Sequence, residues 1–250
     1  MNQVFIYSPG GNITALLEGF SGDLVCISKR IIFELPHIEQ VGFIQSPISN
    51  KNSFHLEMMG GEFCANAARC AAYRYMQLKN SQNVKFSVSG FAEPLSATMQ
   101  AGVVSLFIPG SLYVRTQIKE DFCIIDLQGI RFLVTQSPEL TLNRSHMISE
   151  YCENFSAIGF LLLTKQFGMN SIQPWVWVKS IGEIILETSC GSGSIAAALS
   201  LSSLALSNQQ YSIKQPSGSL LNVSLFSENL GLKKITLSGH VRFLGTENLI

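Results

Sequence analysis

The sequence predicts an α+β fold made of two similar lobes. Short runs rich in Val, Ile, Phe and Leu, bounded by Gly, Pro, Asn and Ser, occur along the whole chain and are typical of strands. Helical patterns are fewer. The order of these elements in the first half of the chain is repeated in the second half, and internal similarity of this kind indicates two related structural units.

The first half begins with strands and contains the clearest helical pattern. The alanine-rich stretch "ANAARCAAYRYMQLK", Ala65–Lys79, is typical of a helix, and a weaker helical pattern covers residues 23–34. The expected strands of this half cover residues 3–8, 13–19, 40–46, 53–59, 84–90 and 103–110.

The second half shows the same two kinds of pattern. Its clearest helix, "SIAAALSLSSLALS", covers residues 194–207, and a weaker one covers residues 143–155. The expected strands of this half cover residues 130–136, 158–165, 175–180, 183–189, 220–226 and 233–239.

Each half runs through a strand pair, a cysteine, a helix and further strands. The matching positions are Gly42 and Gly159, Cys64 and Cys190, Gly90 and Gly218, and Gly110 and Gly239. Because the offset between them is close to half the chain, we expect a first lobe at residues 1–113 and a second at residues 114–237. A linker is expected near residues 110–119, and the final strand, residues 238–250, is a candidate to return to the first lobe.

Composition narrows the class of partner. The chain has 250 residues, 46% of them hydrophobic, which is enough apolar material for one large domain or two lobes. The 17 basic residues balance the 17 acidic ones and form no basic block, so a nucleic-acid or anionic-membrane surface has no electrostatic support. We expect a small-molecule partner, and the sequence leaves the oligomeric state open, with a homodimer as one option.

The sequence carries no pattern for export or for a membrane span. Its first residues, "MNQVFIYSPGGN", lack the charged and apolar regions of a secretory signal. The longest apolar-looking stretch, residues 195–206, is shorter than the roughly 18 to 20 residues that span a bilayer. We therefore expect a soluble, cytoplasmic protein, in which thiols stay reduced. No CxxC metal pair occurs among its cysteines, which are Cys26, Cys64, Cys70, Cys123, Cys152 and Cys190.

Two of these cysteines stand where a strand-like run passes into a helix. "EFCANAARC" contains Cys64, and "TSCGSGSIA" contains Cys190. A thiol in the first turn of a helix lies beside unpaired backbone N–H groups and the positive end of the helix dipole, which lowers its pKa. The same N–H groups can bind a carboxylate. We therefore expect Cys64 and Cys190 to act on a bound carboxylic acid.

Two cysteines facing each other across a cleft would suit racemisation by two bases. One thiolate removes the proton of a chiral carbon, and the other thiol delivers a proton to the opposite face. The helix N-termini would stabilise the developing enolate charge in a site closed to water, and the scheme requires no cofactor. A catalytically idle binding protein or a redox-sensing disulfide stays open as a different class of function.

The chain resembles the diaminopimelate epimerase-like family of cofactor-independent amino-acid racemases. The resemblance rests on "CANAARC", residues 64–70, on "SCGSG", residues 189–193, and on "GGNIT" and "QPSGSL" nearer the two ends. It implies two lobes, each a mostly antiparallel sheet wrapped around a central helix, with the active site in the cleft between them. It also implies that Cys64 and Cys190 are the acid/base pair.

The resemblance further implies a set of substrate contacts. Asn12 and Asn66 would hold the amino and carboxylate groups, and the N–H groups of Ala65, Asn66, Gly191 and Ser192 would bind the carboxylate. Glu62 and Glu187 precede the cysteines, where a carboxylate would either raise a thiol's pKa or orient the substrate amine.

The expected substrate is histidine. The epimerases carry a Glu-Arg pair ahead of the second cysteine, but Val178 and Lys179 stand in its place here, and the Asn-Pro-His block of the family is missing. The "EQVGFI" stretch, with Glu39 and Gln40, is instead similar to the branch that contains the histidine racemase of staphylopine-type metallophore synthesis. Glu39 would pair with a basic or imidazole side chain, and diaminopimelate remains the alternative substrate.

Overall fold

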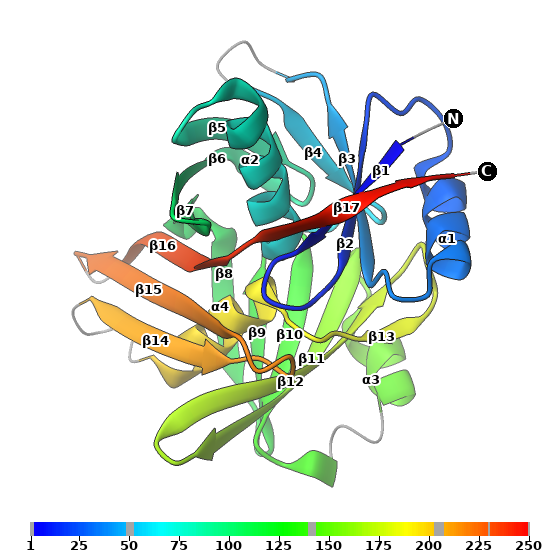
Figure 1. Ribbon diagram of the computed structural model, residues 1–250. Helices are drawn as coiled ribbons and strands as arrows, with labels where there is room; N and C mark the ends of the chain where they lie inside the picture. Colours follow the sequence, from blue (N-terminus) through cyan, green and yellow to red (C-terminus); the bar gives the residue numbers. More distant parts are fainter. Residues whose placement is uncertain (1–2, 49–52, 140–143, 203–207, 230, 250) are drawn as a thin grey trace.

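The structure is a computed structural model that describes residues 3–48, 53–139, 144–202, 208–229 and 231–249 (Figure 1). Its helices are α1 (Leu24–Glu34), α2 (Ala65–Lys79), α3 (Arg144–Tyr151) and α4 (Gly191–Leu201), and a 3-10 turn, η1, covers Gly110–Leu112. Its strands are β1 (Gln3–Ser8), β2 (Thr14–Glu18), β3 (Gln40–Gln45), β4 (His55–Met58), β5 (Asn83–Val88), β6 (Phe91–Gln100), β7 (Val103–Pro109), β8 (Tyr113–Ile118), β9 (Phe122–Leu127), β10 (Ile130–Thr135), β11 (Ala157–Gln166), β12 (Met169–Val178), β13 (Ile184–Leu186), β14 (Gln209–Lys214), β15 (Leu220–Glu228), β16 (Gly231–His240) and β17 (Arg242–Asn248).

These strands form one continuous, mixed, hydrogen-bonded sheet with few helices. The pairs β2–β3, β4–β5, β10–β11 and β12–β14 are parallel, and the other pairs among the described residues are antiparallel. β16 pairs with β7, and β17 lies antiparallel to β1 (Figure 1), so hydrogen bonds join the two halves of the chain. The repeat therefore lies within a single sheet.

The repeated glycines Gly42 and Gly159 occupy matching places in this sheet. Gly42 in β3 pairs with Leu16 on one side and with β4 on the other, and Gly159 in β11 pairs with Phe132 and with β12. A Cβ atom at Gly159 would lie 2.2 Å from the Phe132 ring. The glycine therefore leaves room for an aromatic side chain of the core.

The helices α2 and α4 are buried within the curved sheet. α2 packs against β2 to β7, and α4 packs against β9 to β12 and β14 to β16. Nearly every residue in their first two turns is buried, and most of these are Ala, Gly or Ser, which let the strands approach closely on all sides. Both helices begin in the interior, where their N-termini meet.

The helix predictions hold with shifts at the ends. The prediction of α2 is confirmed, and α1 follows Asp23, whose carboxylate accepts from the N–H groups of Val25 and Cys26 at 3.0 Å. α4 begins at Gly191, ahead of the expected start, and the expected residues 203–207 lie outside the described residues. α3 is shorter than the expected 143–155, and residue 143 is also outside them.

Four strands, β6, β8, β9 and β14, were not among the expected strands. β6 contains Pro94, which lies between Phe91 and Leu95, where the pairing with β5 shifts register, so Pro94 interrupts no regular ladder. The residues expected to form a linker are instead η1 and β8, and β8 pairs with β9 in the sheet.

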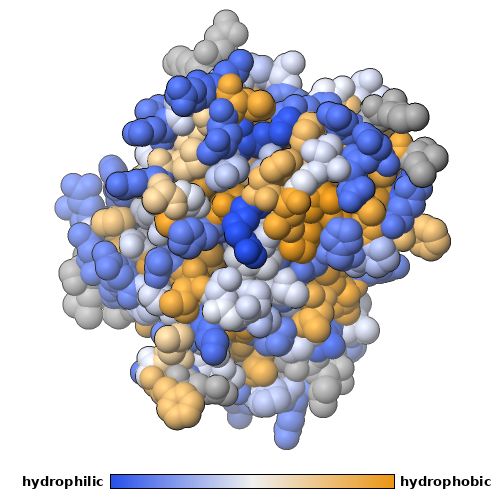
Figure 2. Space-filling view, in the orientation of Figure 1, coloured by the Kyte–Doolittle hydropathy of each residue, from blue (hydrophilic) through white to orange (hydrophobic). Residues whose placement is uncertain are grey.

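The surface carries both hydrophilic and hydrophobic side chains. On the face in Figure 2, hydrophilic side chains surround smaller hydrophobic areas. Exposed apolar side chains, such as Phe33 and Ile118, are scattered over several elements. Within the described part of the chain, we find no helix with the length and apolar character that crossing a membrane requires.

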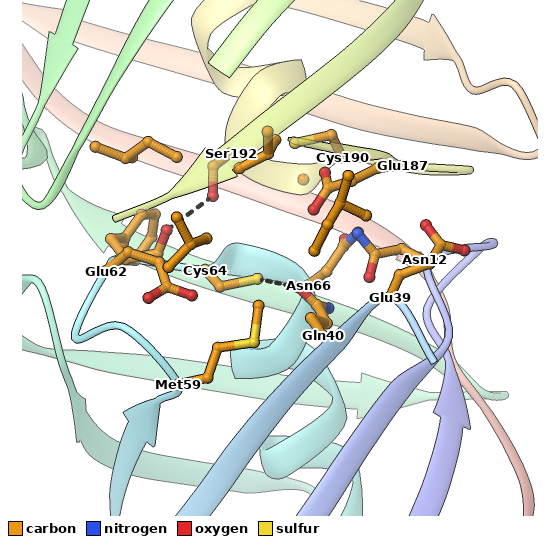
Figure 3. A pocket seen from close by; sticks show the side chains of 16 residues that line it. Asn12, Glu39, Gln40, Met59, Glu62, Cys64, Asn66, Glu187, Cys190 and Ser192 are labelled. Atoms are coloured by element: carbon orange, nitrogen blue, oxygen red, sulfur yellow. Dashed lines mark hydrogen bonds between the residues drawn. The ribbon is translucent and has the colours of Figure 1, made fainter. Parts of the chain in front are cut away.

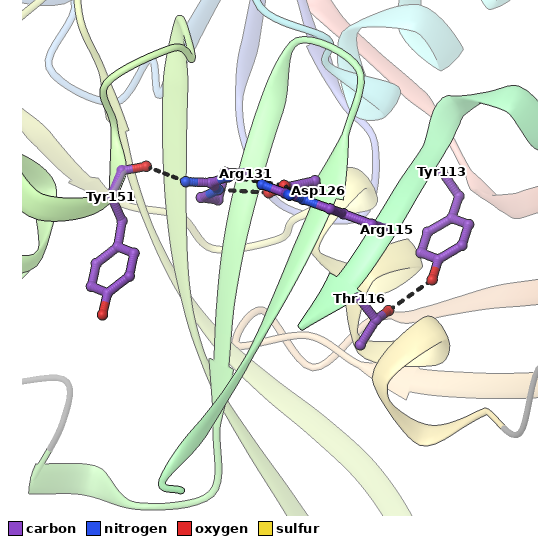
Figure 4. A network of polar contacts seen from close by, with 6 residues as sticks. All are labelled: Tyr113, Arg115, Thr116, Asp126, Arg131 and Tyr151. Atoms are coloured by element: carbon purple, nitrogen blue, oxygen red, sulfur yellow. Dashed lines mark hydrogen bonds and ion pairs between the residues drawn. The ribbon is translucent and has the colours of Figure 1, made fainter. Parts of the chain in front are cut away.

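A charged network ties β8, β9 and β10 to the end of α3 (Figure 4). The buried carboxylate of Asp126 accepts from Arg115 Nε at 2.7 Å and from Arg131 Nε at 2.6 Å. Arg131 Nη1 also donates to the carbonyl of Tyr151 at 2.8 Å. Burial raises the pKa of Asp126, but the hydrogen bonds and charges of the two arginines outweigh it and bring the pKa below its ordinary value.

We expect Asp126→Asn to lower the free energy of unfolding by about 3 kcal/mol, because it leaves Arg131 half-paired in a mostly buried position. Since the folded-state pKa of Asp126 is depressed, its stabilisation is present at neutral pH and is lost as the pH falls through that value. Urea unfolding at neutral and acid pH measures both effects. Asp121 is an exposed residue directly before β9, and Asp121→Asn should change the free energy of unfolding little. Equal losses for both variants would contradict the stabilising role of the Asp126 ion pairs.

Candidate active site

One pocket lies where the N-termini of α2 and α4 meet (Figure 3). It encloses about 410 Å³ including its open mouth. The residues that line it are Asn12, Glu39, Gln40, Met59, Glu62, Phe63, Cys64, Asn66, Ile130, Val176, Val178, Ile185, Glu187, Cys190, Gly191 and Ser192. Three of these side chains are carboxylic acids, and none of the residues in this lining is a lysine or an arginine.

Cys64 caps α2 and points into the pocket. Its backbone is extended, with φ −127°, and its sulfur accepts from the N–H of Ala67 at 3.4 Å. Its thiol donates to Gln40 Oε1 at 2.8 Å, and Gln40 Nε2 donates to the Thr14 hydroxyl at 2.6 Å. Thr14 thereby fixes the amide of Gln40 with its oxygen toward the thiol.

Cys190 caps α4 in the same way. Its backbone φ is −134°, and its sulfur accepts from the N–H of Gly193 at 3.2 Å. The N–H of Cys190 donates to Gln215 Oε1 at 2.9 Å, and Gln215 Nε2 donates to the Ser194 hydroxyl at 2.9 Å. The two cysteines thus occupy equivalent positions and lie on opposite sides of the pocket (Figure 3).

The electrostatics of the thiols differ from the sequence-based expectation. Burial raises the pKa of Cys64 far above its usual range, and the negative charge of Glu187 raises it further. Burial and Glu187 act on Cys190 in the same direction. The N–H groups of the first helical turns lower both pKa values, but by less than burial raises them. The prediction that the two thiols have lowered pKa values is therefore wrong for the pocket in this structure, although the helix N-termini act in the expected direction.

Polar contacts between the two helix N-termini surround the pocket. Ser192 Oγ accepts from the N–H of Ala65 at 3.1 Å. The side-chain amides of Asn12 and Asn66 both donate to the carbonyl of Ser189, at 2.7 Å and 3.0 Å. Residues from distant parts of the sequence therefore hold the wall that carries Cys190 against the one that carries Cys64.

Glu187 and Asn12 each keep an acceptor atom without a partner among the described residues. Both side chains are buried, and the atoms are Glu187 Oε2 and Asn12 Oδ1. Burial raises the pKa of Glu187 to about 8, and the charge of this carboxyl group in turn raises the pKa of Cys190. Such unsatisfied buried acceptors are costly unless they bind a ligand's donors.

The other two carboxyl groups are engaged within the protein. Glu39 Oε2 accepts from the N–H of Thr188 at 2.7 Å, and Glu39 Oε1 accepts from the Thr188 hydroxyl at 2.5 Å and from the N–H of Ile13 at 3.4 Å. Glu62 Oε2 accepts from the N–H of Gly60 at 2.9 Å, and burial raises the pKa of Glu62 to about 7.

The structure brings all the expected site residues together. Each of them lines the pocket except Ala65, whose N–H is bonded to Ser192 beside it. Sequence analysis did not identify Thr188, which binds Glu39, or Gln215, which binds Cys190. The only signal for them was their position, Thr188 within "ETSC" and Gln215 within "QPSG", close to the motifs already quoted. The described residues contain no group of three or more His, Cys, Asp or Glu side chains arranged to hold a metal ion.

Comparisons with known proteins agree with this geometry. A family model described as "Histidine racemase CntK N-terminal domain" matches residues 5–247. A histidine racemase of Fusobacterium nucleatum is 29% identical over 211 residues, covering 76% of this chain and 77% of that protein. The histidine racemase of Staphylococcus aureus is 24% identical over 268 residues, covering 96% and 94%.

Solved structures show the same fold. A hydroxyproline epimerase from Agrobacterium vitis, with bound trans-4-hydroxy-L-proline, has a TM-score of 0.66 at 11% identity, covering 98% of this chain and 90% of that one. A phenazine biosynthesis protein of the PhzF family from Bacillus anthracis has a TM-score of 0.68 at 10% identity, covering 100% and 99%.

These similarities identify the protein as an isomerase of the racemase and epimerase type. The family match runs through β1 to β17 and includes both cysteines. The chain belongs to the family of histidine racemase CntK N-terminal domains.

Proposed function

We propose that the chain is a histidine racemase that inverts Cα with Cys64 and Cys190 as its acid/base pair and without a cofactor. The observation that carries the proposal is the pairing of two helix-capping cysteines across one pocket. The similarity of the chain to histidine racemases supports histidine as the substrate.

In the proposed reaction, the thiolate of one cysteine removes the α-proton, and the thiol of the other gives its proton to the opposite face of Cα. Each turnover thus exchanges the protonation states of the two sulfurs. The α-carboxylate would lie at the N-termini of α2 and α4, near the N–H groups of Asn66, Gly191 and Ser192, which helical geometry leaves without intrahelical acceptors. These groups would stabilise the enolate charge that develops when the proton leaves.

The charge of the pocket favours a cationic substrate side chain. Glu39, Glu62 and Glu187 make its lining acidic, and we assign the imidazole contact to Glu39, whose Oε1 bond to Ile13 is long at 3.4 Å. A second amino-acid head group, as in diaminopimelate, would bring a second carboxylate. No cationic side chain in the lining would meet it.

The same proposal includes the organisation of the chain into two lobes. The first lobe, residues 1–113, would surround α2 together with β17, and the second lobe, residues 114–237, would surround α4. Their relative movement would admit a small amino acid to the pocket. The contacts of Ser189 and Ser192 across this boundary would then break and form with each turnover.

The mechanism calls for an amino acid as the partner, without nucleic acid or membrane, and the enzyme would work in the cytoplasm.

Solvent exchange tests the proposal. Incubation of the protein with L-histidine in D₂O, without added pyridoxal phosphate, should yield D-histidine that carries deuterium at Cα, because the donated proton comes from a solvent-exchanged thiol. Mass spectrometry and chiral chromatography measure the two results. A panel of L-amino acids that includes LL-diaminopimelate decides the substrate. Absence of exchange with every member would contradict a racemase and favour a binding or redox role.

A further inference from the structure

Glu187 is the carboxyl group of the pocket that the protein itself leaves incompletely bonded. It is 7% exposed, and its Oε2 has no partner among the described residues. Asn12, which lines the same pocket, also presents an unbonded buried oxygen, Oδ1. Two neutral or anionic acceptors in one pocket fit a ligand group with several N–H donors, and the α-ammonium of an amino acid is such a group.

Glu187 also lies beside one of the two thiols. It lies three residues before Cys190 and lines the same pocket, and a negative charge on Glu187 raises the pKa of the Cys190 thiol. Figure 3 shows Glu187 beside Cys190, across the pocket from Cys64 and Glu62. Its position lets it act on the ligand and on Cys190 together.

Among the described residues, the ionisable groups that most affect the pKa of Glu187 are acidic. Those that influence it are Cys190 on its own segment, Glu39 before β3 and Glu62 in the loop before α2, and Cys64 at the start of α2 is in turn influenced by it. An ionised Glu187 therefore opposes a second negative charge on either sulfur.

We propose that Glu187 binds the substrate's α-ammonium and, until that cation arrives, holds Cys190 in its protonated form. The proposal rests on the racemase function above and assigns Glu187 as the residue that couples ligand binding to the state of the base. Above about pH 8, where Glu187 is ionised, pairing with the ammonium offsets the carboxylate charge. The S–H bond of Cys190 then breaks, its proton passes to water, and the resulting thiolate faces the α-hydrogen of the enantiomer bound on its side.

The first test needs no substrate. Iodoacetamide alkylation of Cys190, followed by peptide mass spectrometry across neutral and alkaline pH, reports the ionisation of this thiol. Glu187→Gln should move the alkylation profile of Cys190 to lower pH by about one unit or more. Above about pH 8, where Glu187 is ionised, the rate should then rise about tenfold. An unchanged or slower profile would overturn the proposal.

Two variants separate this effect from a general disturbance of the pocket. Glu62→Gln removes an equally buried carboxyl group that has no direct bond to Cys190, and it should leave the Cys190 profile in place. Glu187→Asp keeps the charge and should restore a profile close to that of the unaltered enzyme. If Glu62→Gln moved the Cys190 profile as far as Glu187→Gln, the specific coupling would be wrong.

The second test measures proton release on binding. Calorimetry above about pH 8, where Glu187 is already ionised, in buffers of different ionisation enthalpy should show that L-histidine releases about one proton, whereas 3-(imidazol-4-yl)propionate, which lacks the ammonium, releases none. Glu187→Gln should abolish the difference between the two ligands. Equal release by both ligands would overturn the role of the ammonium. A shifted alkylation profile without any binding of histidine would instead contradict the proposed substrate and leave the coupling of Glu187 to Cys190 standing.

Discussion

Replacement of Cys64 or Cys190 with alanine should reduce racemisation of histidine by at least about a thousandfold in both directions. Each direction needs a base on one face of Cα and an acid on the other, and loss of a positioned proton-transfer group typically costs about 10²- to 10⁴-fold. Chiral assays with L- and D-histidine measure the loss. Because both sulfurs are held by the first turn of a buried helix, neither can move to take the place of the other.

The two variants should differ in the exchange that remains. A single thiol can still remove and return a proton on its own face, so each variant should exchange the α-proton of one enantiomer only, and the two variants should select opposite enantiomers. Cys26→Ala, at an exposed cysteine outside the pocket, is the matched control and should keep full activity. Near-normal turnover in either active-site variant would contradict the two-thiol mechanism.

Histidine should exceed LL-diaminopimelate in kcat/KM by roughly 30- to 1,000-fold. This factor corresponds to about 2 to 4 kcal/mol, the usual cost of leaving a charged head group without its hydrogen-bonding partner. Val178 lines the pocket and offers such a group only a methyl surface, and the lining contains no lysine or arginine.

Glu39→Gln tests which carboxylate meets the imidazole. It should lower kcat/KM for histidine more than for a neutral analogue of similar size, whereas Glu62→Gln should affect both substrates alike. The ratio between the two substrates corrects for any general damage to the pocket, including loss of the Glu39 bonds to Thr188. A preference for diaminopimelate would contradict histidine as the substrate but leave the two-thiol mechanism intact. If Glu62→Gln lowered kcat/KM selectively for histidine, Glu62 and not Glu39 would be the residue that contacts the imidazole.

Local sequence was a good guide wherever local chemistry determines the structure. The ends of α2 could be predicted because a capping residue precedes an alanine-rich run and Asn80, with φ 48°, ends it. Both cysteines could be found because the strand-to-helix junction itself makes a thiol chemically useful. These features depend on residues that are neighbours in the sequence.

Features that depend on distant residues could not be predicted. The raised pKa values of the thiols result from burial by the whole sheet and from Glu187, so helix position alone predicted the wrong direction. Gln215 reaches Cys190 across 25 residues, and Thr188 reaches Glu39 across 149. Residues 113–118 were expected to belong to a linker because their own composition does not identify a strand. Their pairing with β9 is what makes them strand β8.

The pairing of β1 with β17 also bears on how the chain folds. Gln3 lies opposite Asn248, so β1 is synthesised long before one of its two neighbouring strands. Contacts so distant in sequence close slowly, since the entropy of a very long loop must be lost before they form. During translation, β1 therefore exposes an unpaired edge that can join other chains. The sheet beside β1 is completed only after β17 has been made.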